Sequence, residues 1–99
     1  MKKIVLFCGA GMSSSLLVLK IRDAATAANY ECKVEAYSST NSQYAKDADI
    51  VLVGPQIRFH VKDLQKELNC PVAVIEDEAY GSMNGVKILA QARKILKDE

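Results

Sequence analysis

The sequence has few of the residues that build metal sites. Its 99 residues include one histidine and three cysteines, and no two cysteines form a Cys-x-x-Cys pair. His60 is far in sequence from Cys8, Cys32 and Cys70. These spacings argue against a zinc site, and we expect neither a metal nor a cofactor. Separated cysteines, odd in number, are typical of a reducing compartment, so we expect a cytoplasmic protein.

A large excess of charge and a long apolar run are also missing. Thirteen basic and twelve acidic residues give a net charge of +1, which does not suggest binding to nucleic acid or to a membrane surface. No segment approaches the roughly 20 apolar residues of a membrane span, and the N-terminal apolar run is too short for a signal peptide. Without repeats, low-complexity segments or linkers, the chain is expected to form one domain over residues 1–99.

The chain does contain a regular alternation of strand and helix patterns. Continuous apolar runs at 4–7, 50–53 and 72–75 predict strands that are buried on both faces. Residues 32–37 alternate between apolar and polar, which indicates a half-exposed strand at the edge of a sheet. Three helices are expected between and after these strands. Their apolar stripes are Leu17, Ile21, Ala24, Ala25 and Ala28, then Ile57, Val61, Leu64 and Leu68, then Val86, Leu89, Ala90 and Leu96.

Strand–helix alternation of this kind predicts an α/β fold. We expect a three-layer sandwich, with a four-stranded parallel sheet and helices on both faces, similar to small tyrosine phosphatases. Right-handed crossovers and the edge character of the second strand favour the order 2-1-3-4. In such sheets ligands bind beyond the carboxyl ends of the strands, where the order reverses. The expected loops there are the one after Phe7, Gly54-Pro55-Gln56, and residues 76–83.

A segment of small residues follows the first strand, with the sequence Cys8-Gly9-Ala10-Gly11-Met12-Ser13-Ser14-Ser15. Small residues let backbone N–H groups turn toward an anion, and the first amides of a helix capped by Ser13 add positive potential. A thiol in that field has a lowered pKa and is a better nucleophile. A cysteine ending a strand can also be a small core residue, but its position here favours Cys8 as a nucleophile inside a phosphate-binding loop.

Two familiar glycine-rich phosphate loops fit this segment poorly. A dinucleotide-binding loop would need a third glycine where the chain has Ser14, and a nucleoside-triphosphate loop would need a Gly-Lys-Ser/Thr sequence. No lysine occurs between Lys3 and Lys20.

A cysteine phosphatase is the stronger enzyme alternative. Tyrosine phosphatases of this architecture have an arginine six residues after the cysteine, which clamps the phosphoryl oxygens, and a general acid on a later loop. The acid could come from Glu76-Asp77-Glu78, but the arginine position is Ser14. Without the arginine, stabilisation of the phosphoryl group would depend on amides, hydroxyls and the helix dipole. Such a site would hold a phosphocysteine and hydrolyse it poorly, as a carrier must.

Other candidate residues have weaker patterns. His60 is a possible phosphoryl acceptor, although a surface histidine is the simpler interpretation. Cys32 alternates with core positions and Cys70 precedes the amino end of a strand, so both are interpreted as structural. Residues near the expected site could form a docking patch for partner proteins, namely Gln56, Tyr80, Gly81 and Met83.

The chain resembles the IIB component of the lactose/cellobiose/diacetylchitobiose branch of the sugar phosphotransferase system. The residues that carry the resemblance are 4–17, with the Cys8 motif, 48–56, which read Ala-Asp-Ile-Val-Leu-Val-Gly-Pro-Gln, and 80–85, which read Tyr-Gly-Ser-Met-Asn-Gly. The likeness covers essentially the whole chain, and the Cys8 motif is specific.

The resemblance implies that the protein is a phosphotransferase with a phosphocysteine intermediate. Cys8 would receive a phosphoryl group from a phosphohistidine of a IIA protein and pass it to a sugar held by the membrane-embedded IIC protein. Residues 9–15 would form the phosphate loop. Cellobiose or diacetylchitobiose is favoured over lactose, because the lactose component is often fused to its transporter and this chain is expected to stand alone.

Two other functions remain open from the sequence. One is a stand-alone cysteine phosphatase or arsenate reductase that uses Cys8. The other is a regulatory binding domain that responds to phosphorylation of Cys8.

Overall fold

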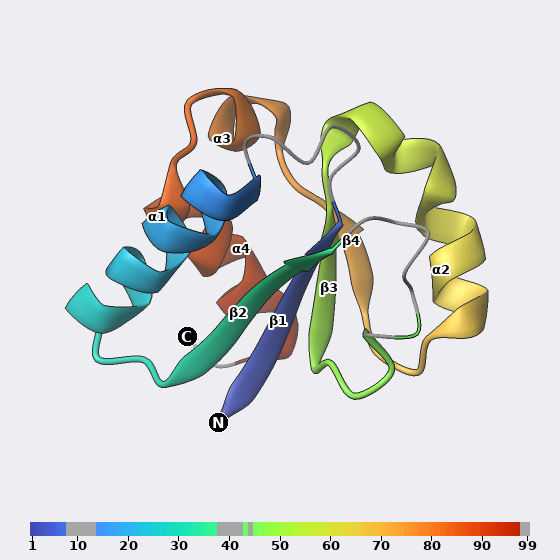
Figure 1. Cartoon of the computed structure of the whole chain (residues 1–99), viewed down its shortest axis with the longest axis horizontal. Helices are drawn as coiled ribbons and strands as arrows, with labels where there is room; N and C mark the ends of the chain where they lie inside the picture. Colours follow the sequence, from blue (N-terminus) through green and yellow to red (C-terminus); the bar gives the residue numbers. More distant parts are fainter. Residues whose placement is uncertain (8–13, 38–42, 44, 98–99) are drawn as a thin grey trace.

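A four-stranded parallel sheet forms the centre of the molecule. The computed structural model describes residues 1–7, 14–37, 43 and 45–97. The strand order is β2-β1-β3-β4, so the predicted order 2-1-3-4 is confirmed (Figure 1). The strands are β1 (Lys2–Phe7), β2 (Cys32–Tyr37), β3 (Ile50–Val53) and β4 (Val72–Val74).

Helices cover both faces of the sheet, as Figure 1 shows, with α1 and α4 on one face and α2 on the other. The three-layer α/β fold predicted from the sequence is therefore confirmed. The helices are α1 (Ser14–Ala27), the 3-10 helix η2 (Pro55–His60), α2 (Val61–Glu67), α3 (Asp77–Gly81) and α4 (Gly85–Leu96).

The two central strands are buried on both faces, as their continuous apolar runs predict. In β1, Ile4 and Leu6 pack under α1 and α4, whereas Val5 and Phe7 pack under α2. All four side chains have no exposed surface. The edge strand β2 is half-exposed: Val34 is fully buried, and the other residues of the strand are only partly buried or exposed.

The apolar stripe of the first helix differs from the predicted one at two positions. Leu17, Ile21, Ala24 and Ala25 are buried, together with Val18, which the predicted stripe omits. Ala28 is exposed, so its assignment to the stripe is wrong. The physical reason is that α1 ends at Ala27 and Asn29 then adopts a left-handed φ of 57°. Asparagine tolerates this conformation, which turns the chain out of the helix.

Two of the four residues predicted for the apolar stripe of the last helix, Val86 and Ala90, are wrong, whereas Leu89 and Leu96 do pack against the core. Val86 is 68% exposed and Ala90 is exposed, whereas Ile88 and Ala92 are buried beside the correctly predicted Leu89. The face of α4 that packs on the core differs from the predicted one because Gly85 packs directly on the backbone of α1. A β-carbon at Gly85 would lie 2.3 Å from the carbonyl oxygen of Lys20. This close approach fixes which face of α4 points to the sheet.

Residues 76–83, expected to form a loop, contain the short helix α3 instead. The backbone N–H of Tyr80 donates to the carbonyl of Glu76 at 2.9 Å, and Ser82 Oγ donates to the carbonyl of Glu78 at 2.8 Å. Acidic side chains in the first turn stabilise a helix N-terminus, which explains why this polar segment forms a helix. The turn after it has Met83 at a φ of 53°.

Candidate functional site

The carboxyl ends of the central strands meet where the strand order reverses. β1 ends at Phe7 and β3 ends at Val53, and these two residues are paired in the parallel register. The next residue, Gly54, donates its backbone N–H to the carbonyl oxygen of Phe7 at 2.8 Å. The helix η2 begins directly after it, at Pro55. This edge is the position at which open α/β sheets bind ligands.

Two predicted site residues converge on Gly54. A β-carbon built at this glycine would lie 3.1 Å from Oε1 of Gln56, 3.4 Å from Cε1 of Tyr80 and 3.6 Å from the carbonyl oxygen of Phe7. Gln56 comes from η2 and Tyr80 from α3, so side chains from two separate elements meet beside the end of β1. Gln56 is exposed and Tyr80 is half-buried, with part of its ring against the core.

The other two predicted docking residues differ from each other in exposure. Gly81 is exposed at the end of α3, and a β-carbon there would meet nothing within 4 Å. Met83 is half-buried and packs against the core under α1 and α4. Met83 therefore offers less surface to a partner than the more exposed Gln56 and Gly81 do.

The predicted nucleophile lies outside the described residues. The residues outside the described part of the chain include Cys8, Gly9, Ala10, Gly11, Met12 and Ser13. The expected N-cap role of Ser13 therefore stays a prediction. Ser14 and Ser15 are the first two residues of α1. In sequence, the Cys8 segment thus connects the end of β1 with the N-terminus of α1, as the motif predicts.

The two described cysteines lie at the opposite end of the sheet, where the strands begin. Cys32 begins β2 and Cys70 comes shortly before β4, so both are at the amino ends of strands. Each is half-buried, and burial raises the pKa of both thiols. A raised pKa reduces the thiolate fraction at neutral pH, which makes a thiol a poor nucleophile. Their structural interpretation agrees with this environment.

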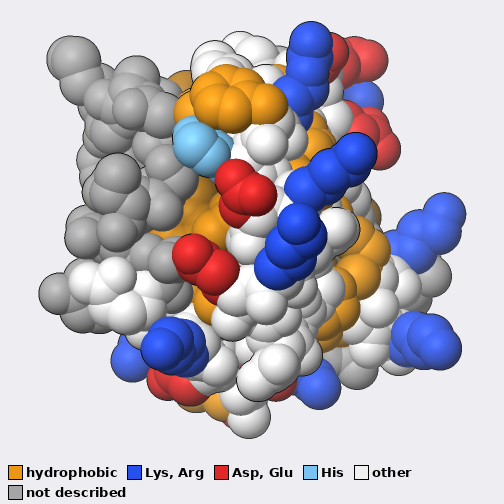
Figure 2. Space-filling view, turned by 90° about the vertical axis from the view of Figure 1, so that its right-hand side faces the viewer, with side chains coloured by type: hydrophobic (Ala, Val, Ile, Leu, Met, Phe, Trp, Pro, Cys, Tyr) orange, Lys and Arg blue, Asp and Glu red, His pale blue; other side chains and the backbone are white. Residues whose placement is uncertain are grey.

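His60 is partly exposed at the end of η2 and lies beside an exposed aromatic ring. The rings of Phe59 and His60 have centroids 4.4 Å apart, and Phe59 is 70% exposed. Figure 2 shows the histidine with hydrophobic surface next to it and acidic side chains below it. Phe59 is not among the residues predicted from the sequence. An aromatic residue off the apolar stripe of Ile57 and Val61 was the available signal.

The acidic residues before and within α3 are directed to solvent. Glu76, Asp77 and Glu78 are exposed, and Glu78 forms a 3.5 Å ion pair with Lys87 of α4. No described group of three or more His, Cys, Asp and Glu side chains could hold a metal ion. Within the described part of the chain, every helix is too short or too polar to span a membrane.

Comparison with known proteins identifies the family. A family model described as "PTS system, Lactose/Cellobiose specific IIB subunit" matches residues 3–91. The chain belongs to the lactose/cellobiose-specific IIB family of the sugar phosphotransferase system. IIB components are phosphotransferases that work with IIA and IIC partners, and the family resemblance seen in the sequence is confirmed.

Individual IIB proteins are similar over their whole length. The oligo-beta-mannoside-specific EIIB component of Bacillus subtilis is 39% identical over 103 aligned positions, covering 100% of both chains. The cellobiose-specific EIIB component of Lactococcus lactis is 35% identical, covering 96% of each chain.

Solved IIB structures have the same fold. The cellobiose-specific IIB protein of Borrelia burgdorferi is 37% identical, with a TM-score of 0.78 over 98% of this chain and 93% of that one. The lactose-specific IIB domain of Streptococcus pneumoniae has a TM-score of 0.81 at 14% identity, over 95% of this chain and 96% of that one. The second likeness concerns the fold alone.

Proposed function

We propose that Cys8 is the phosphoryl carrier of a sugar phosphotransferase system, within a single IIB domain over residues 1–99. The observation that carries the proposal is the sequence position of the Cys8 motif. It directly follows β1 at the reversal of strand order and directly precedes α1. Cys32 and Cys70, the alternative thiols, lie at the opposite edge with raised pKa values.

The reaction consists of two transfers. In the first, the Cys8 thiolate attacks the phosphorus of a phosphohistidine on a IIA protein, so that a P–S bond forms and the P–N bond breaks. In the second, a sugar hydroxyl held by the membrane protein IIC attacks the phosphorus and loses its proton. The P–S bond then breaks and the thiolate is restored. Both transfers take place in the cytoplasm.

Backbone amides of residues 9–15 and the N-terminus of α1 hold the phosphoryl oxygens in this proposal. These groups stabilise negative charge without an arginine. Because Ser14 stands where phosphatases have the arginine clamp, the phosphocysteine is protected from rapid hydrolysis. It therefore persists until the second partner binds.

Partner proteins are proposed to dock on the surface around Gly54, formed by Gln56, Tyr80 and Gly81 with Met83 behind them. Gln56 and Tyr80 come from two elements and lie beside the end of β1, and Gly81 follows Tyr80 at the end of α3. IIA and IIC use the site in turn, so each interface is expected to be small and short-lived. The sugar is of the cellobiose or diacetylchitobiose type, and oligo-β-mannosides are worth testing beside them because of the most similar relative named above.

The test is incubation with a phosphorylated IIA protein of this family. Intact-mass and peptide analysis should find one phosphoryl group on Cys8 of the wild type, none on Cys8→Ser, and wild-type labelling of Cys32→Ser and Cys70→Ser. Addition of IIC membranes with sugar should then remove the label and yield sugar phosphate. Rapid hydrolysis of a free aryl phosphate without partners would instead support a phosphatase. Stable label with no transfer to sugar would support a regulatory domain.

A further inference from the structure

The sheet has two free edges, β2 and β4, whose main-chain groups could pair with another strand. In a parallel strand, the N–H and C=O of one residue point to the same side, and the side alternates along the strand. On either side of β4, the N–H of Ile75 donates to the carbonyl oxygen of Val53 at 2.9 Å, and the carbonyl oxygen of Pro71 accepts from the N–H of Val51 at 2.9 Å. The residues between them, Val72 and Val74, therefore turn their carbonyl groups away from the sheet.

Each of these outward carbonyls accepts a hydrogen bond from a glutamine. Gln65 Nε2, on α2, lies 3.2 Å from the carbonyl oxygen of Val72, and Gln91 Nε2, on α4, lies 2.7 Å from that of Val74. Gln91 Oε1 also accepts from the backbone N–H of Glu76 at 3.4 Å. Its carboxamide thus supplies a donor and an acceptor, as a neighbouring strand would. Since α2 and α4 lie on opposite faces, the β4 edge is closed from both sides.

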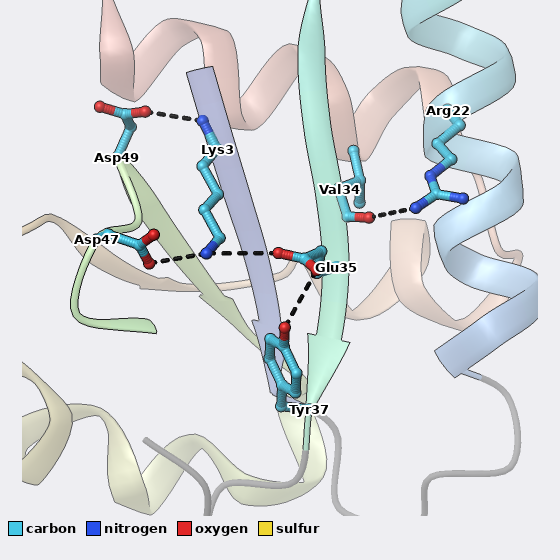
Figure 3. A network of polar contacts seen from close by, with 7 residues as sticks. All are labelled: Lys3, Arg22, Val34, Glu35, Tyr37, Asp47 and Asp49. Carbon is cyan, nitrogen blue, oxygen red and sulfur yellow. Dashed lines mark hydrogen bonds and ion pairs between the residues drawn. The ribbon is translucent and has the colours of Figure 1, made fainter. Parts of the chain in front are cut away.

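On the β2 edge, an arginine binds one outward carbonyl. Nη2 of Arg22, on α1, donates to the carbonyl oxygen of Val34 at 2.9 Å. Figure 3 shows that this carbonyl points away from β1 and toward the guanidinium group. Two hollows of about 870 and 450 Å³ lie along α1 and β2, and both are lined by Arg22 and Val34. The arginine therefore lies across the path that an added strand would follow.

We propose that Arg22, Gln65 and Gln91 act as edge guards. Their side chains bind one outward carbonyl of β2 and two of β4, which an added strand would need, and so prevent pairing with a second copy of this chain. Three side chains from three helices make the same kind of bond, to the outward carbonyls of both edge strands. The inference concerns self-association and does not depend on phosphoryl transfer.

The test compares the oligomeric state of guard variants by sedimentation velocity over a range of concentrations. We expect wild type to remain a monomer. Arg22→Ala and the double variant Gln65→Ala/Gln91→Ala should self-associate. Their apparent dissociation constants for self-association should be at least about tenfold lower than that of wild type, which corresponds to about 1.4 kcal/mol. Lys20→Ala and Lys66→Ala, which change exposed neighbours on α1 and α2, should behave as wild type.

Hydrogen exchange identifies the surface that pairs. In the associated variants, the outward amides of Val34, or of Val72 and Val74, should become protected as concentration rises. Where an alanine variant does not fold, Arg22→Met and Gln91→Leu keep the side-chain volume and remove the hydrogen bonds. Folded variants that stay monomeric and merely unfold at a lower temperature would overturn the proposal, since that result means the three side chains only anchor their helices. Association without protection of the edge amides would also overturn it.

Discussion

The backbone N–H of Gly54 donates a hydrogen bond to the carbonyl oxygen of Phe7, with 2.8 Å between nitrogen and oxygen. This bond extends the pairing of β1 and β3 beyond Val53, and Phe7 is the residue before Cys8. Gly54 has φ −62° and ψ 145°, which are extended values that any residue can adopt. Glycine at position 54 is therefore explained by the small space beside Gln56 and Tyr80, and not by its backbone conformation.

The first prediction concerns substitution of this glycine. In Gly54→Ala, the new β-carbon lies 3.1 Å from Oε1 of Gln56, which must shift by a few tenths of an ångström, and it touches Cε1 of Tyr80 at 3.4 Å. The end of the glutamine is flexible, and we expect the fold to persist. The initial rate of Cys8 phosphorylation by IIA should fall, by up to about 100-fold if reacting groups move by about 1 Å. Gly54→Val should reduce the rate further.

Ala90→Ser, at an exposed position of α4 outside the proposed docking surface, is the control for this change. The fold should persist and the phosphorylation rate should stay at the wild-type value. A wild-type rate in both Gly54 variants would mean that the placement of Gln56 and Tyr80 does not affect the site.

The second prediction concerns the contact between α1 and α4. A β-carbon at Gly85 would lie 2.3 Å from the carbonyl oxygen of Lys20 and 2.9 Å from the backbone nitrogen of Ile21. Backbone atoms cannot rotate away as a side chain can, so the helices must separate. We expect Gly85→Ala to lower the free energy of unfolding by about 3 kcal/mol or more, measured by urea denaturation.

Ala90→Gly, at an exposed position of the same helix, provides the comparison. It changes helix propensity alone and should cost about 1 kcal/mol. If Gly85→Ala cost less than Ala90→Gly, the close packing of the two helices would not be what selects glycine at position 85.

The buried strands could be predicted from the sequence because a short, continuous apolar run is typical of a strand that is buried on both faces. Ile50 to Val53 are fully buried, as a two-sided strand requires. Helix phase was less certain because α4 has apolar residues on more than one face. Val86 and Ile88 are equally apolar, and the contact of Gly85 with Lys20, which is distant in sequence, decides that Ile88 is buried.

The arrangement of the loops could be predicted where it depended on strand ends. Gly54, Gln56 and Tyr80 were expected to be neighbours because β3 and β4 end at the same edge of the sheet, and the three residues do converge. Met83 was assigned to the same patch from its sequence position. Its left-handed φ turns the chain, and its side chain packs inward. A single positive φ of this kind has no clear sequence signal at methionine.

The third prediction concerns pH and the ion pairs of Lys3, drawn in Figure 3. Lys3 Nζ lies 2.7 Å from Oδ1 of Asp47 and 3.4 Å from Oε1 of Glu35. The hydrogen bond between Lys3 and Asp47 raises the pKa of the lysine and lowers that of the aspartate. The stabilisation from Asp47 is present above its ordinary pKa of 3.8 and lost as pH falls through the lowered value. The stabilisation from Lys3 is present below 10.5 and lost as pH rises through the raised value.

Lys3→Met should therefore be less stable than wild type between these two limits, and the difference should shrink outside them. Chemical denaturation at a series of pH values measures this, and added salt should reduce the difference because the pair is partly exposed. Lys62→Met, at an exposed position of α2, is the control and should follow the wild-type pH profile. A difference that persists unchanged at pH 2 would mean that lost packing, and not charge, accounts for the effect.

The fourth prediction concerns the relative reactivity of the three thiols. Burial raises the pKa of Cys32 and Cys70, whereas a thiol before a helix N-terminus has a lowered pKa. Because a difference of one pKa unit changes the thiolate fraction about tenfold below both values, iodoacetamide at pH 7 should alkylate Cys8 at least about ten times faster than either other cysteine. Peptide mass spectrometry over time measures each site. Cys8→Ser should leave only the slow reactions, which accelerate as pH rises. Preferential alkylation of Cys32 or Cys70 at pH 7 would contradict the assignment of Cys8 as the activated thiol.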